Sequence, residues 1–251
     1  DQIEKLTISA VEETASSQED ADLIAKVVAA VSDELANKVV EEVNKNSIEE
    51  KQSLSAKVLK SIVELNPDRM EILSDENSSN MIAQTIKAAK KQSEGGSTDE
   101  IDLTNIIAEV VSNSGTITAS KVLYELNNSS QGVDSKLSLE VVINLAKQVN
   151  YEEKLEILEV TSSSIGNNVS KLIADAIKNA TSEKDLELIT SIVEKSKGTI
   201  TDKIINSSKI NDENKEKISK IVVKIVEKNP EKAVEIIKRN GNTGEVVDVV
   251  K

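Results

Sequence analysis

The sequence predicts an all-α fold: an α-solenoid of short antiparallel helices, built from an internal repeat of about 82 residues with five helices per unit. Three observations lead to this prediction. Apolar residues recur with helical spacing, one helix junction is written three times, and the composition favours thin, layered packing. Phe, Trp and Cys are absent and only two residues are Tyr, so Ile, Val, Leu and Ala must form the core.

The spacing of apolar residues indicates helices although many of these residues are β-branched. Ile218, Ile221, Val222, Ile225 and Val226 stand at i, i+3, i+4, i+7 and i+8, on one stripe of a helix. The residues between them are mostly polar, with a period near 3.6 and not 2. The period therefore outweighs the strand propensity of Val and Ile.

The repeated junction is a helix boundary. In "ELNPDRMEIL" we expect one helix to end at Asn66 and the next to have Pro67 at its first position, where the missing N–H costs nothing. "EKNPEKAVEII" repeats the pattern around Asn229, and "QVNYEEKLEIL" repeats it around Asn150 with Tyr151 in place of proline. The three asparagines are 84 and 79 residues apart.

Two further phrases support the same period. "GTITASKVL" begins at Gly115 and "GTITDKII" begins 83 residues later, at Gly198. "LTISAVEET" at Leu6, "MIAQTIKAA" at Met81 and "LIADAIKNA" at Leu172 align without gaps. The predicted helices are, in order, 17–31, 33–45, 49–66, 67–75 and 79–92, then 99–113, 116–127, 134–150, 151–163 and 167–180, then 183–197, 199–208, 211–229 and 230–240.

The register of the repeat predicts how the chain is divided. The segments are an N-terminal helix equivalent to the last helix of a unit (1–15), a first unit (16–95), a second (96–180), an incomplete third (181–240) and a flexible tail (241–251). The first segment matches what the third unit lacks, so a neighbouring molecule could dock there head to tail. Two alternatives stay open: residues 1–15 cap the stack, or the chain was cut from a longer repeat protein.

Composition argues against several classes of function. Without Cys there is no disulfide or thiol nucleophile, and without His the commonest general base and metal ligand is missing. The net charge of −13 repels nucleic acid and anionic lipid. No stretch approaches the roughly eighteen apolar residues of a membrane span. We therefore expect no enzyme activity, no catalytic residues, no cofactor, no metal, no nucleic acid and no membrane insertion.

Individual polar motifs have structural explanations. "SDENSSN" (Ser74–Asn80) is interpreted as a polar turn between helices in preference to a calcium loop. Thr118 and Ser120 are interpreted as part of a helix start, since a hydroxyl nucleophile needs an adjacent base. Adjacent carboxylates such as Glu12 and Glu13 point apart on a helix and suit a solvated face.

These observations predict a non-enzymatic structural protein that assembles head to tail into a filament or surface layer. The alternative is a monomeric helical-repeat scaffold that binds another protein. The candidate self-association residues are Ile3, Leu6, Ala10, Val11, Val246, Val247, Val249 and Val250. The valines of the tail favour either a donated edge strand or the start of a helix. An extracellular or cell-surface location is expected, with a cytoplasmic one as the alternative.

Overall fold

The computed structural model describes most of the chain and confirms the all-α prediction. It describes residues 18–45, 52–95, 102–129, 136–148, 163–196 and 212–232, with the single residues 5, 9, 151, 234 and 238. The described part contains helices and no strand. The helices are α2 (Gln18–Ala30), α3 (Asp33–Lys45), α4 (Gln52–Leu65), α5 (Arg69–Ile72), α6 (Asp75–Ser93), α7 (Leu103–Asn113), α8 (Thr116–Ser129), α9 (Leu137–Leu145), α11 (Ser163–Asn179), α12 (Glu183–Lys195) and α14 (Asp212–Lys228).

The chain divides into two compact units, Asp1–Ser129 and Ser130–Lys251. The first contains α2 to α8 and the second contains α9 to α14. The boundary falls inside the predicted second repeat unit (96–180), so the compact units and the predicted repeat units are different divisions of the chain.

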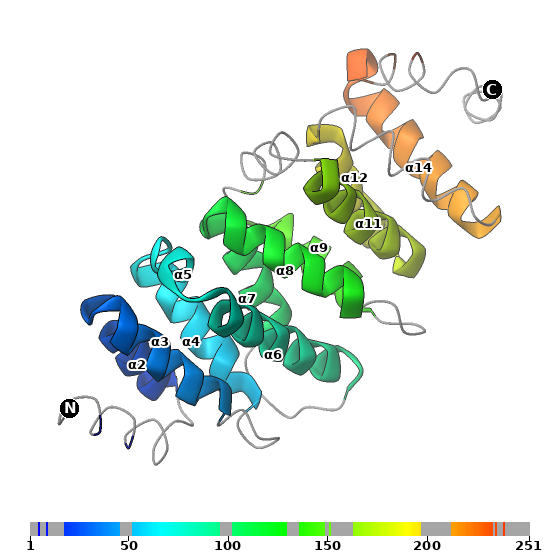
Figure 1. Cartoon of the computed structure of the whole chain (residues 1–251). Coiled ribbons are helices and arrows are strands. Elements are labelled where there is room, and N and C mark those ends of the chain that lie inside the picture. The colour runs from blue at the N-terminus through cyan, green and yellow to red at the C-terminus, as the bar shows by residue number, and fades with distance from the viewer. Residues whose placement is uncertain are drawn as a thin grey trace. The chain divides into compact units, whose positions relative to one another are not determined.

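Helix α4 is the centre of the first unit. It packs against α2, α3, α5, α6 and α7 (Figure 1). Its core side chains face several neighbours, and Leu59, Ile62 and Val63 are buried together with the small residues Ser55 and Ala56. Small residues let neighbouring helices approach closely, because nothing larger separates the two backbones. The core of this unit has no Phe or Trp and consists mainly of aliphatic side chains.

Arg69, the first residue of α5, connects this helix to the end of α2 and the start of α3. Its Nε donates to the Val28 carbonyl oxygen at 2.8 Å, and one terminal nitrogen donates to the Val31 carbonyl oxygen at the end of α2. The other terminal nitrogen lies 2.9 Å from the Asp33 carboxylate at the start of α3. A buried guanidinium thus satisfies carbonyl groups that the end of a helix leaves without intrahelical donors.

The junction before Arg69 differs from its predicted form. Asn66, Pro67 and Asp68 lie between α4 and α5, and the helix begins at Arg69 rather than at Pro67. The amide N–H groups of Arg69, Met70 and Glu71 each donate to the carbonyl three residues earlier. A tight turn of this kind redirects the chain within a few residues, and proline tolerates it because it has no N–H to donate.

Side-chain caps set the beginnings of the longer helices. The Ser74 hydroxyl accepts from the amide N–H of Asn77 at the start of α6, four residues before the predicted start at 79. The Asp102 carboxylate accepts from the amide N–H of Asn105 at the start of α7. Ser182 and Asp185 form a reciprocal capping box at α12. Each cap satisfies an N–H that has no partner inside the helix.

Gly115 separates α7 from α8 and allows a close approach by α5. A Cβ atom on this residue would lie 1.9 Å from Oε1 of Glu71 and 2.8 Å from its carboxyl carbon. The repeated phrase "GTIT" therefore includes a glycine that, at Gly115, makes room for a side chain of a neighbouring helix.

In the second unit, α9 packs against α11 and α12, and α14 packs against α11 and α12. Tyr151, buried to 3% exposure, has its hydroxyl 3.2 Å from the Ser191 hydroxyl, and the ammonium of Lys195 lies 5.2 Å from its ring centre. Where the other two junctions have proline, this junction thus uses an aromatic ring to contact α12. The helix before it, α9, is shorter than the predicted 134–150.

Candidate functional site

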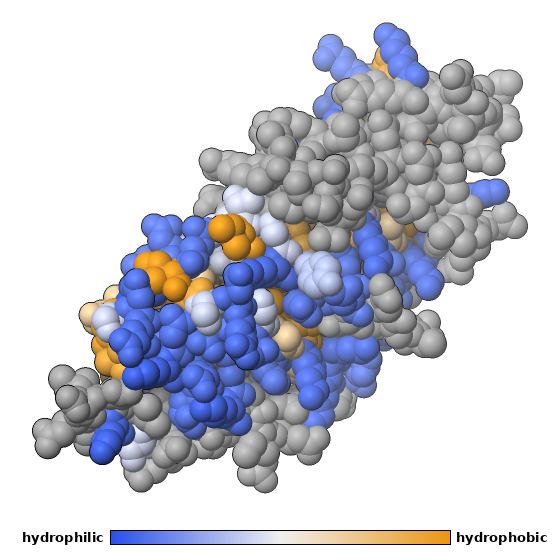
Figure 2. Space-filling view, in the orientation of Figure 1, coloured by the Kyte–Doolittle hydropathy of each residue, from blue (hydrophilic) through white to orange (hydrophobic). Residues whose placement is uncertain are grey.

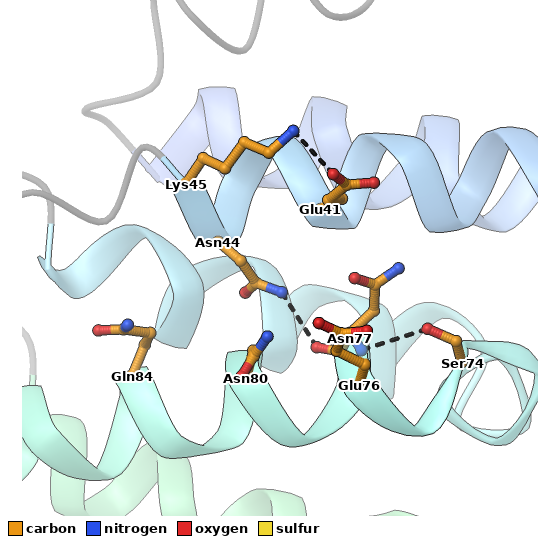
Figure 3. A pocket seen from close by; sticks show the side chains of 8 residues that line it. All are labelled: Glu41, Asn44, Lys45, Ser74, Glu76, Asn77, Asn80 and Gln84. Carbon is orange, nitrogen blue, oxygen red and sulfur yellow. Dashed lines mark hydrogen bonds and ion pairs between the residues drawn. The ribbon is translucent and has the colours of Figure 1, made fainter.

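A polar groove between α3 and α6 is the first candidate for a binding site. It has a volume of about 510 Å³. Figure 3 shows the side chains that line it, from the last turns of α3 and the first turns of α6. They are Glu41, Asn44, Lys45, Ser74, Glu76, Asn77, Asn80 and Gln84.

Hydrogen bonds across this groove join the two helices. The Asn77 amide group donates to the carbonyl oxygen and the side-chain oxygen of Asn37, at 2.9 and 3.0 Å. The Asn44 amide group donates to the Asn77 carbonyl oxygen at 3.1 Å (Figure 3), and the Ser74 N–H donates to the Asn37 side-chain oxygen at 2.7 Å. The asparagines therefore act as connections between α3 and α6.

The charged groups of the groove are exposed. Lys45 lies 2.7 Å from the Glu41 carboxylate and 3.7 Å from that of Glu42. The hydrogen bond to Glu41 raises the pKa of Lys45 above its usual value. An amine held more firmly in its charged form is less suited to act as a base at neutral pH.

The "SDENSSN" segment is the start of α6 and not a calcium loop. Ser74 caps the helix, and the Asp75 carboxylate lies 2.9 Å from the Lys121 ammonium of α8. Within the residues that the structure describes, no three acidic side chains come together to form a metal site. The chemistry of the groove is that of amides holding two helices together.

The second candidate is a face of α2. The sequences of α2 and α7 can be aligned by matching their last residues, Ala30 and Asn113. Residues 23–28 (LIAKVV) then align with residues 106–111 (IIAEVV). Leu23 then corresponds to Ile106, Lys26 to Glu109 and Val27 to Val110. The two helices have nearly the same apolar pattern. A difference in solvent exposure between equivalent residues therefore comes from the helices that surround each of them.

In α7 this pattern is buried, and α4, α6 and α8 all pack against this helix. The Glu109 carboxylate pairs with Lys60 of α4 at 3.8 Å, and the Leu103 N–H donates to the Gln92 side chain of α6 at 2.9 Å. With 100° per residue, Ile106 and Val110 lie within about 100° of Glu109 on the circumference of α7. Their exposed fractions are 2% and 0%.

The corresponding face of α2 is open. Leu23 is 60% exposed, Lys26 and Ala30 are exposed, and Val27 is half-buried. On the other side of the same helix, Ala25 and Val28 are fully buried and α2 packs against α4. We call Leu23, Lys26, Val27 and Ala30 the α2 face.

The site residues predicted from sequence lie elsewhere. Ile3, Leu6, Ala10, Val11, Val246, Val247, Val249 and Val250 are outside the described residues. Thr118 is buried, and the Ser120 hydroxyl donates to the Thr116 carbonyl oxygen at 2.6 Å, so both belong to the first turns of α8 as predicted. The α2 face was not predicted. Its one sequence signal was the match between residues 23–28 and 106–111.

The remaining exposed apolar side chains of the first unit are scattered. They include Leu65 of α4, Ile72 of α5, and Ile117 and Tyr124 of α8. Figure 2 shows a mainly hydrophilic visible face, with small apolar areas over α5 and the start of α8. Single exposed aliphatic side chains are normal on soluble surfaces.

Comparison with protein-family models, curated proteins and solved structures gave no match. Among the described residues, no helix combines the length and apolar character required to cross a membrane.

Proposed function

We propose that this chain is a non-enzymatic structural protein, an α-solenoid of repeats of about 82 residues that assembles head to tail into a filament or surface layer. The observation that carries the proposal is the open α2 face. Its counterpart on α7 is buried, and Glu109 on that side of α7 pairs with Lys60 of α4, so the face has the residue pattern of a surface that stacks on a preceding repeat.

Two pairs of contacts at equivalent positions support the repeat. Ser61 of α4 donates to Asp22 of α2 at 2.5 Å, and Lys224 of α14 pairs with Glu187 of α12 at 3.0 Å. Ser61 and Lys224 both stand five residues before the junction asparagine. Asp22 stands nine residues before Val31, the first residue after α2. Glu187 stands nine residues before Ser196, the first residue after α12.

The second pair lies at the junctions themselves. Arg69 and Lys232 are each the third residue after the asparagine. Arg69 donates to the carbonyl oxygen of Val31, the first residue after α2, and Lys232 donates to that of Ser196, the first residue after α12, at 2.7 Å. The same cationic connection therefore occurs in both compact units.

Several helix pairs of the first unit have counterparts in the second. Helix α4 packs against α2, α6 and α7 in the first unit. In the second unit, α9 packs against α11 and α12, and α14 packs against α12. In a stack of this kind each repeat buries its apolar stripe on the next, and a stripe left open is available to another molecule.

A second function is favoured by the exposed side chains outside the α2 face. A monomeric repeat scaffold would use surfaces such as Ile72 and Ile117 to hold a different protein. We rank it below self-assembly because these side chains are separate, whereas the α2 face reproduces a packed interface of the same chain. An extracellular or cell-surface location goes with the structural proposal.

Light scattering and negative-stain microscopy of the purified chain test the proposal. Self-assembly predicts a mass that rises with protein concentration and regular polymers in the micrographs. A single monomer mass at every concentration, with dispersed particles, would contradict it and favour the scaffold. Leu65→Asp is a suitable control against Leu23→Asp, because both leucines are exposed and only Leu23 belongs to the α2 face.

A further inference from the structure

We infer that the α2 face binds α14 of a second copy of this chain. The inference rests on the proposed head-to-tail assembly and names both surfaces of the contact. In the first unit, the surface that covers the α7 counterpart of the α2 face comes partly from α4. The partner sought for α2 is therefore a helix of the α4 type that is itself open to solvent.

Helix α14 is of this type. Residues 58–67 of α4 and its junction (VLKSIVELNP) align with residues 221–230 (IVVKIVEKNP), and both segments end in the Asn-Pro junction. The alignment pairs Ala56 with Ser219, Lys60 with Val223 and Val63 with Val226. Because Lys60 contacts α7, helical periodicity places the other two α4 positions on the same side of that helix.

The equivalent side of α14 is more exposed than that of α4. Ala56 and Val63 are 0% and 4% exposed, whereas Ser219 and Val226 are half-buried. Val223 is 40% exposed, and Glu227, one turn further, is exposed. We call Ser219, Val223, Val226 and Glu227 the α14 face. Two complementary halves of one internal interface are thus both open on the same chain.

The charges of the two faces also match. In the contact between α4 and α7, a cation (Lys60) on α4 meets an anion (Glu109) on α7 at 3.8 Å. On α14 the position of Lys60 holds apolar Val223, and the anion of the α14 face is Glu227, which aligns with Glu64 of α4. On α2 the position of Glu109 holds a cation, Lys26, so the two faces carry opposite charges. Charge pairing of this kind selects partner and register more than it adds affinity.

The contact is heterologous because two different surfaces meet. A dimer therefore keeps one open α2 face on one copy and one open α14 face on the other, so addition continues until a closed ring forms or a filament grows. Apolar Leu23, Val27, Val223 and Val226 form its centre, and the charged pair lies beside them.

Mixing two blocked variants tests the inference most directly. Leu23→Asp and Val223→Asp each place a carboxylate at the centre of one face, and each should weaken self-association about 30-fold or more. A copy with Leu23→Asp still has an intact α14 face, and a copy with Val223→Asp still has an intact α2 face. The equimolar mixture should therefore form dimers containing one copy of each, measured by sedimentation velocity with one variant labelled.

A charge exchange is the second measurement. Lys26→Glu and Glu227→Lys should each weaken self-association, and the double variant should recover the wild-type affinity. Leu65→Asp is the control and should assemble as the wild type does, and circular dichroism should give the same helical content for all variants. If an aspartate variant has lost helical content, the charge-exchange variants alone test the contact. Lys26 and Glu227 are exposed, so exchanging their charges should leave the fold unchanged.

Each outcome decides between the inference and the proposed function. A wild-type chain that stays monomeric overturns both. A wild type that assembles, with Val223→Asp behaving as the wild type, overturns the pairing with α14 and leaves head-to-tail assembly standing. If Leu23→Asp lowers thermal stability but leaves the mass unchanged, the α2 face is covered by the chain itself and the inference is wrong.

Discussion

At the scale of single residues, Arg69 gives the clearest case of one side chain holding several elements. Its side chain is 10% exposed and binds the carbonyl oxygens of Val28 in α2 and of Val31 just after it, and the carboxylate of Asp33. The fork of the guanidinium is what makes three acceptors reachable at once, because its donors point in fixed directions. Lysine at the equivalent junction position, Lys232, binds the Ser196 carbonyl oxygen.

We predict that Arg69→Ala lowers the free energy of unfolding by about 2–4 kcal/mol, because carbonyl oxygens at the end of α2 lose a charged donor. Arg69→Lys should cost less, since one hydrogen bond can be kept. Urea unfolding followed by circular dichroism measures both. Lys38→Ala is the control, because the Lys38 pair with Glu34 is exposed and should change stability by less than about 0.5 kcal/mol.

Two aspartates should respond to pH in opposite directions. The hydrogen bond from Lys121, and then its charge, lower the pKa of Asp75 below the usual 3.8, whereas burial raises the pKa of Asp175 above that value. Stability from Asp75 is therefore fully present above its unfolded pKa and is lost as pH falls through the lower folded value. The charge of Asp175 disfavours the folded state at neutral pH, and this effect disappears in acid.

We accordingly expect Asp75→Asn to be less stable than the wild type at pH 7 and Asp175→Asn to be more stable. The difference for Asp75→Asn should vanish once the pH lies below the lowered folded pKa of Asp75, and that for Asp175→Asn once the pH lies below the unfolded pKa of Asp175. Unfolding midpoints measured from pH 7 to strong acid give the two curves. Differences of the same sign for both variants would show that these carboxylates are not in the described surroundings.

At the scale of elements, the order of helices followed from the sequence, but several boundaries did not. The predicted 17–31 and 33–45 correspond to α2 and α3 within a few residues, since polar residues interrupt a regular apolar period there. The proline suggested a helix start at Pro67, yet the turn continues to Arg69. For α6, the serine three residues before Asn77 was a signal for the earlier start, because a Ser hydroxyl commonly caps the third N–H.

The central position of α4 was not predictable from its sequence. Its pattern resembles that of α14, yet Val63 is 4% exposed and the equivalent Val226 is half-buried. Periodicity shows which residues share a side of a helix, but the number of neighbouring helices is set by contacts far along the chain. For the same reason the sequence did not distinguish exposed Leu23 from buried Ile106.

The packing of α4 leads to a prediction about the core. Ile62 is fully buried in α4, which contacts five other helices. Ile62→Ala should lower the free energy of unfolding by about 2–5 kcal/mol, since the lost methyl groups leave a cavity among rigid neighbours. Leu65→Ala, at an exposed position of the same helix, should change it by less than about 0.5 kcal/mol. Similar losses for the two variants would contradict the central position of α4.

At the scale of the whole molecule, the charge and the two open faces act against each other. A net charge of −13 makes copies of the chain repel one another. The proposed contact is mainly apolar, with Leu23 and Val223 near its centre. Salt therefore weakens this attraction much less than it weakens the charge repulsion between copies. Copies should therefore associate more readily when the long-range repulsion is screened.

We predict that raising the salt concentration from about 0.05 M to about 0.5 M strengthens self-association, because the screening length falls below the distance between most charges of neighbouring copies. The pair of Lys26 and Glu227 would lose some attraction, but an exposed pair contributes only about 0–1 kcal/mol. Sedimentation equilibrium at several sodium chloride concentrations measures the association constant, with Leu23→Asp as the variant that should stay weak throughout. Association that weakens steadily with salt would mean that ion pairs, and not the apolar centres of the two faces, hold the copies together.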